Sequence, residues 1–99
     1  MLVDKVIQED GTIECLYKSS NILVSEWNEK TQKLIITFNY GGKYAYHNVE
    51  PKDYLRFEID KSQGKVFADH IKYYKTEKLD KVDTTILKES VERIMNERS

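Results

Sequence analysis

The chain has 99 residues, of which 39% are hydrophobic and 33% are charged, and its formal net charge is −1. These values predict one soluble globular domain and exclude a disordered chain or two independent domains. The single cysteine, Cys15, excludes an internal disulfide and a zinc site built from several cysteines. No apolar stretch is long enough for a membrane span, and the first ten residues carry acidic groups where a signal peptide is basic. We therefore expect a cytoplasmic protein without a membrane partner, in the host cytoplasm if it is phage-encoded.

The first half of the chain predicts short β-strands. Runs of β-branched and aromatic residues mark five of them, at residues 2–7, 12–17, 22–27, 33–40 and 43–47. The Asp10-Gly11 and Gly41-Gly42 pairs predict tight turns because glycine accepts positive φ at no steric cost. In the fourth run, the two-residue repeat places four side chains on one face, which we expect to pack on the helices: Leu34, Ile36, Phe38 and Tyr40.

The second half of the chain predicts helices. Pro51 suits the first turn of a short helix over 52–59. After a polar connection that ends at Gly64, helical spacing predicts a second helix through Val66, Phe67, His70, Ile71 and Tyr74. A polar stretch over 75–81 then leads to Asp83 or Thr84, either of which can cap a third helix. That helix carries an apolar stripe, Leu87, Val91, Ile94 and Met95. The stripe either folds back on the domain or pairs with the same helix of another copy.

These elements predict an α+β fold. We expect a small antiparallel sheet, made of an N-terminal hairpin and the central strands, packed by two short helices, with an additional C-terminal helix. The predicted units are a β-hairpin extension over 1–17, a core domain over 18–76 and a C-terminal amphipathic helix over 77–99.

The charges are unevenly spread along the chain. Residues 1–16 hold four carboxylates against one lysine, whereas residues 61–78 hold five lysines against two carboxylates. A polyanion would therefore meet the second region. Thirteen of the sixteen basic residues are lysine, which offers few of the planar forks that read bases in a duplex. Sequence-specific duplex reading is disfavoured.

The candidate catalytic and metal-binding residues are Cys15, His47 and His70. A nucleophile needs a neighbouring base and a group that orients it, and none of the three lies in a recognised nucleophile motif. Cys15 falls in an apolar strand, where a buried structural thiol is the common outcome. The two histidines show no recognised metal-ligand spacing. We therefore expect no enzyme, no cofactor and no metal site. For His70, partial burial with a bond to the backbone and contact with a phosphate are both open.

Aromatic residues beside lysines indicate a binding site. Tyr44 and Tyr46 point the same way from one strand, so they either stack on the bases of a ligand or belong to the sheet core. Ser62-Gln63-Gly64 before a helix suits an anion, although an ordinary helix cap uses the same residues. Ser19 and Ser20 could face the same site. The complete candidate set is Ser19, Ser20, Tyr44, Tyr46, Ser62, Gly64, Lys65, His70, Lys72 and Tyr74.

From Lys18 to Tyr74, the order of motifs resembles the KTSC family, named after the C-terminal domain of some lysyl-tRNA synthetases and also found as a stand-alone protein in bacteria and phages. The resemblance is carried by the paired serines at 19–20, the Tyr-x-Tyr at 44–46, the Ser-x-Gly at 62–64 and the following Ile71-Lys72. It implies a small sheet followed by helices, with RNA binding as the role suggested for the family. The family usually has Val-Pro after the tyrosines, whereas here Glu50 separates Val49 from Pro51.

Three functions follow as hypotheses. The first is non-enzymatic binding of a phosphate-bearing nucleotide, linear or cyclic, in one pocket between the Tyr-x-Tyr strand and the Ser-x-Gly helix start. A phage protein that sequesters nucleotide immune signals is one setting, and it favours a homo-oligomer held by the C-terminal helix. The second is an RNA-binding module in which residues 61–78 follow the backbone of a single strand. The third is a protein interaction domain that uses the C-terminal helix.

Overall fold

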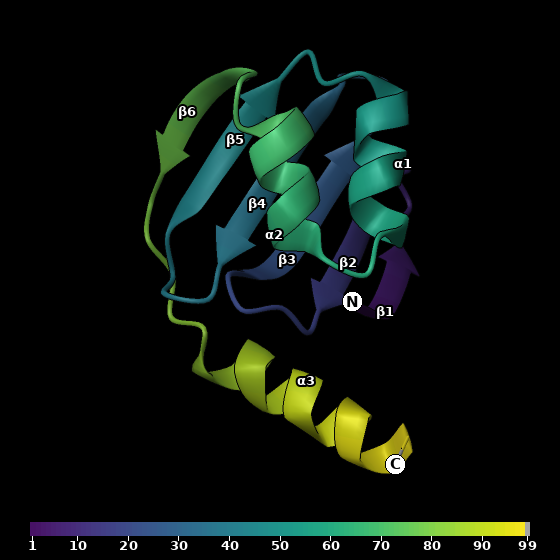
Figure 1. The fold of residues 1–99 in the computed structure, drawn as a ribbon, viewed down its shortest axis with the longest axis vertical. Coiled ribbons are helices and arrows are strands. Elements are labelled where there is room, and N and C mark those ends of the chain that lie inside the picture. The colour runs from purple at the N-terminus through teal and green to yellow at the C-terminus, as the bar shows by residue number, and fades with distance from the viewer. Residues whose placement is uncertain (99) are drawn as a thin grey trace.

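The computed structural model describes residues 1–98, and its six strands lie side by side in chain order (Figure 1). Every neighbouring pair is antiparallel, and each strand pairs with the next one along the chain, from β1 to β6. The strands are β1 (Leu2–Ile7), β2 (Ile13–Tyr17), β3 (Ile22–Asn28), β4 (Lys33–Phe38), β5 (Lys43–His47) and β6 (Lys75–Leu79). The helices are α1 (Pro51–Ile59), α2 (Gln63–Val66), the π-helical turn η1 (Phe67–Ile71) and α3 (Thr85–Arg98). This arrangement confirms the predicted α+β fold, including the N-terminal hairpin and the C-terminal helix.

The predicted Gly-Gly turn joins β4 to β5. Phe38 N–H donates to Gly42 O at 2.8 Å, and Gly41 has a φ of +101°. A Cβ on Gly41 would lie 2.5 Å from the Val82 carbonyl oxygen, so only glycine fits there. Because the chain turns after Phe38, Tyr40 is outside the strand and is 61% exposed. The expectation that Tyr40 packs under the helices was wrong.

The stretch 75–81, predicted as a polar connection, contains a sixth strand. β6 pairs with β5, with His47 opposite Lys75 and Tyr44 opposite Lys78. This strand lies at the edge of the sheet and is largely exposed, so it needs no regular apolar face. Its lysines also discourage further strand pairing at that edge.

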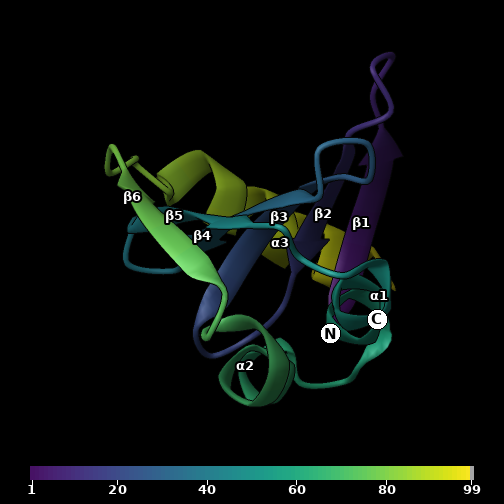
Figure 2. The ribbon, with the colours of Figure 1, turned by 90° about the horizontal axis from the view of Figure 1, so that it is seen from above.

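The first two helices cover one face of the sheet, which we call the helix face (Figure 2). Trp27 of β3 stacks on Tyr54 of α1, with ring centroids 4.7 Å apart and planes 6° apart. Tyr17 of β2 meets the edge of Phe57. The second helix begins at Gln63, earlier than the apolar spacing indicated, and ends in η1, where Lys72 N–H donates to Phe67 O at 2.9 Å.

The third helix packs on the opposite face of the same sheet (Figure 2). Its predicted stripe meets a small second core on β1 and β3 made of Val3, Leu23 and Val24. The stripe therefore folds back on the domain. Because it is already packed there, it does not support the predicted homo-oligomer, which stays a prediction. Asp83 Oδ1 accepts hydrogen bonds from Thr85 N–H and Oγ1–H, at 2.9 and 2.7 Å, and these bonds lower the pKa of Asp83. The predicted segment 77–99 extends past the described residues at Ser99.

None of the helices within residues 1–98 has both the length and the apolar character needed to cross a bilayer.

Candidate functional site

The two tyrosines of the Tyr-x-Tyr strand both point to the helix face, but only one is available to a ligand. Tyr46 is 3% exposed and lies against the edge of Phe67, with ring centroids 5.6 Å apart. Loss of contact with water raises the pKa of Tyr46 to about 12. Tyr46 is therefore part of the core and cannot stack on a base, which corrects its assignment to the site. Tyr44 is only partly buried.

Two of the three predicted serines, Ser19 and Ser62, accept hydrogen bonds from nearby backbone N–H groups. Ser62 Oγ accepts from Lys65 N–H at 3.3 Å and so caps α2, while Lys65 itself is exposed. Ser19 Oγ accepts two backbone N–H groups of the β2–β3 loop, and Ser20 is exposed. A Cβ on Gly64 would lie 3.4 Å from Asn21 Nδ2, so Gly64 lies against the same loop. In these contacts the Ser-x-Gly start meets the β2–β3 loop, not Tyr44.

Two of the remaining predicted residues, His70 in η1 and Tyr74 shortly after it, make polar contacts with α1, and we call these contacts the polar clamp. Tyr74 O–H donates to Asp53 Oδ2 at 2.5 Å, and Arg56 Nη1 donates to His70 Nδ1 at 3.3 Å. Burial, and then the bond to Asp53, raise the pKa of Tyr74. The Glu50 N–H donates to the Tyr74 hydroxyl at 3.2 Å, so the extra residue before Pro51 ties the start of α1 to this clamp. Lys72 lies apart, with its Nζ 5.2 Å from the centre of the Tyr73 ring.

A group of aromatic rings and lysines gathers at the β4–β6 side of the helix face. We call it the aromatic–lysine surface and define it by Phe38, Tyr40, Tyr44, Phe67, Lys78 and Lys81. Phe38 is its centre, with ring centroids 6.0 Å from Tyr40, 5.8 Å from Tyr44 and 5.4 Å from Phe67. The hydroxyls of Tyr40 and Tyr44 are 3.1 Å apart. Only Tyr44 of the six residues belongs to the site predicted from the sequence. The others come from β4, the turn after it, η1, β6 and the segment after β6: Phe38, Tyr40, Phe67, Lys78 and Lys81.

Two lysines give this surface positive charge. Lys78 lies opposite Tyr44 on β6, so the two side chains leave the sheet on the same face. Lys81 Nζ lies 5.6 Å from the centre of the Tyr40 ring. Within residues 1–98, neither lysine forms an ion pair. Glu77 on β6 bonds to His47 instead, and the strand alternation places that pair on the other face.

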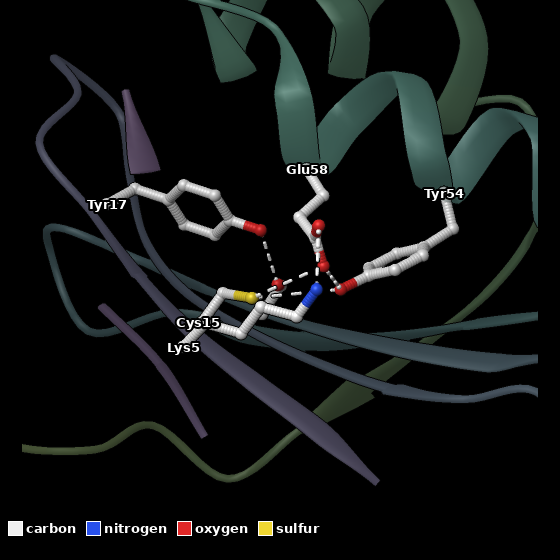
Figure 3. Close-up of polar contacts among 6 residues, drawn as sticks. Lys5, Cys15, Tyr17, Tyr54 and Glu58 are labelled. Carbon is white, nitrogen blue, oxygen red and sulfur yellow. Dashed lines mark hydrogen bonds and ion pairs between the residues drawn. The ribbon is translucent and has the colours of Figure 1, made fainter. Parts of the chain in front are cut away.

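A buried polar cluster lies between α1 and the first two strands (Figure 3). Glu58 Oε1 accepts from Tyr54 O–H at 2.8 Å, and Glu58 Oε2 accepts from Lys5 Nζ at 3.1 Å. Cys15 Sγ lies 3.7 Å from both Tyr54 Oη and Glu58 Oε1. The side chain of Cys15 is 0% exposed, and burial raises its pKa. The thiol is therefore protonated and closed to substrates, as expected of a structural cysteine.

This cluster predicts that the protein loses stability at alkaline pH. Burial raises the pKa of Cys15 above 9.0 and those of Tyr17 and Tyr54 above 10.0. In alkali these groups ionise in the unfolded chain before they do so in the folded protein, so stability is fully present below about pH 9 and falls above it. Urea unfolding at about pH 8 and about pH 10.5 measures the loss of stability. Cys15→Ala should remove the part of that loss that begins near pH 9, where the thiol of the unfolded chain ionises. A free energy of unfolding that stays level over this range would contradict the burial of these groups.

Comparisons with known proteins place the chain in a family. The model of the KTSC domain matches residues 18–74. A crystal structure of a KTSC domain protein from Yersinia pestis superposes with a TM-score of 0.65 and 26% sequence identity, covering 68% of this chain and 96% of that one. No curated protein sequence matches the chain. Because the family model spans more than half of the sequence, this protein belongs to the KTSC domain family.

Proposed function

We propose that the protein binds single-stranded RNA, without catalysing a reaction, on the aromatic–lysine surface. The observation that carries the proposal is an exposed tyrosine, Tyr40, which the β4–β5 turn holds beside the partly buried Tyr44. Two lysines that form no ion pair within residues 1–98, Lys78 and Lys81, flank the two rings. Aromatic rings stack on unpaired bases, and lysines meet the phosphates between them.

The chemistry of the surface favours a strand with little sequence preference. Its two cations are lysines, which contact phosphate as point charges and do not read base edges bidentately. The two phenol hydroxyls add hydrogen-bonding groups that a ribose or a base edge can meet. We expect such binding to take place in the cytoplasm, to be of moderate affinity and to fall with salt.

A single nucleotide is the second candidate, because one base could occupy the Tyr40–Tyr44 pair alone. The pocket predicted from the sequence needed Tyr46 and Ser62 as walls, and these residues serve the core and a helix cap. The candidate therefore rests on the same pair of rings as RNA binding does, the exposed Tyr40 and the partly buried Tyr44. Sequestration of a nucleotide signal would belong to this second candidate.

Salt dependence separates the two candidates and tests the proposal. We expect fluorescence anisotropy with a labelled oligouridine to show an affinity that falls steeply between about 50 and 200 mM salt, by about 0.7 in log–log slope for each phosphate contact. Replacing both Lys78 and Lys81 by alanine should reduce the slope by about 1.4. Lys30→Ala, an exposed lysine of the β3–β4 loop, is the matched control.

Two results would count against RNA binding. If the double variant and Lys30→Ala show the same slope, the aromatic–lysine surface is not where phosphates bind. If uridine monophosphate competes as well as the oligomer and its affinity barely responds to salt, the single-nucleotide candidate takes its place.

A further inference from the structure

A cleft separates α3 from the loop between β2 and β3. Its volume is about 350 Å³, and its floor includes the side chains of Leu23 and Val91. These two residues are 2% and 3% exposed, so the floor is apolar and well packed. The volume falls at the lower end of the range for small-molecule sites in proteins. The cleft is therefore large enough for a compact ligand, and its closed floor offers that ligand little apolar surface.

Polar groups from two loops form one wall of the cleft. Ser19 and Asn39 line it, and Asn39 Nδ2 donates to the Ser19 carbonyl oxygen at 2.8 Å. Ser19 Oγ already accepts from the backbone N–H groups of Asn21 and Ile22. With its oxygen so occupied, the hydroxyl can offer its own proton to a ligand. The wall thus provides a donor that is held in place by the loop.

The rim of the cleft carries surplus positive charge. Lys18 and Lys88 line the cleft together with Glu92. Lys18 Nζ pairs with Glu92 Oε1 at 2.5 Å, across the gap between the loop and α3. Within residues 1–98, Lys88 has no ion-pair partner. One ammonium group at the rim is therefore left for an anion.

We propose that this cleft is a second binding site, for a small organic anion: a phosphate monoester or a carboxylate on a short chain. The anionic head would meet Lys88 and the Ser19 hydroxyl, and a short chain would lie over the closed floor of Leu23 and Val91. The site is lined by α3, whereas the aromatic–lysine surface contains no residue of that helix. The two proposals therefore concern different sites and can be tested independently.

The test is an amide chemical-shift titration of the labelled protein with hexanoate and with hexyl phosphate. Both have one anionic head, and hexylammonium supplies the same chain with the opposite charge. We expect shifts at Ser19, Asn39, Lys88 and Val91 with one or both anions and none with hexylammonium. Lys88→Ala should weaken the binding about fivefold, the scale of one exposed charge contact. Lys72→Ala, an exposed lysine outside the cleft, should leave it unchanged.

The comparison of the two heads assigns the ligand class. A stronger effect of hexyl phosphate points to phosphate monoesters, and a stronger effect of hexanoate points to carboxylates. Equal binding of hexylammonium, or an unchanged affinity in Lys88→Ala, would overturn the proposal. Lys88 is exposed, so loss of the fold is not expected to hide the result. RNA affinity of Lys88→Ala should match that of the unaltered protein, which keeps the two sites distinguishable.

Discussion

Replacing Phe57 by alanine is expected to lower the free energy of unfolding by about 3–5 kcal/mol. Phe57 is 0% exposed under α1, where its ring meets that of Tyr17 at 5.4 Å between centroids and 75° between planes. Truncation removes a buried aromatic ring and leaves a cavity between helix and sheet that the neighbouring side chains fill only in part. Urea unfolding followed by circular dichroism measures the loss.

Leu55 on the same helix provides the control. It lies two residues before Phe57 and is 53% exposed, so Leu55→Ala should change the free energy of unfolding by no more than about 0.5 kcal/mol. A small domain has a total stability of only about 5–15 kcal/mol, and the Phe57 variant should therefore show a clearly lower midpoint. Equal losses in the two variants would contradict the packing of α1 on the sheet through Phe57.

The second large effect is expected at Tyr44. Tyr44→Ala should weaken the binding of single-stranded RNA by about 1–3 kcal/mol, which is roughly 5-fold to 150-fold. The substitution removes one stacking ring, and it also removes the hydroxyl that lies 3.1 Å from that of Tyr40. Anisotropy titration at one fixed, low salt concentration measures the change. A constant salt concentration keeps the phosphate contribution the same for the variant and the unaltered protein.

Two further variants show whether the ring is what matters. Tyr44→Phe keeps the ring and loses the hydroxyl, so it should retain most of the affinity. Tyr73→Ala removes a tyrosine that is 77% exposed but lies outside the aromatic–lysine surface, and it should bind as the unaltered protein does. If Tyr73→Ala lost as much affinity as Tyr44→Ala, the RNA would bind elsewhere.

Local patterns were sufficient to predict most of the fold. Alternation and the Gly41-Gly42 turn located the five predicted strands, and helical spacing located the stripe that packs on the sheet. The sixth strand was not predicted because an edge strand, with one side open to water, carries no regular apolar alternation. Its position depends on pairing with β5, which is a long-range contact that composition does not reveal.

The candidate site was predicted less well, for a related reason. Alternation showed that Tyr44 and Tyr46 share a face, but which one is covered depends on where Phe67 lies, and that is set by the path of the second helix. Ser62 has the residue type of an anion site and of a helix cap, and here it caps. Tyr40 was assigned to the core because the strand was extended through the turn. Sequence spacing identifies faces, whereas packing decides which side chains stay open.

The most direct test of the central claim is an amide chemical-shift titration of the labelled protein with a short oligouridine. RNA binding on the aromatic–lysine surface predicts that the largest shifts fall on Tyr40, Tyr44, Lys78 and Lys81, with little change in α3 or in β1. Shifts centred on α3 or β1, or no shifts at oligomer concentrations far above those of the protein, would contradict it.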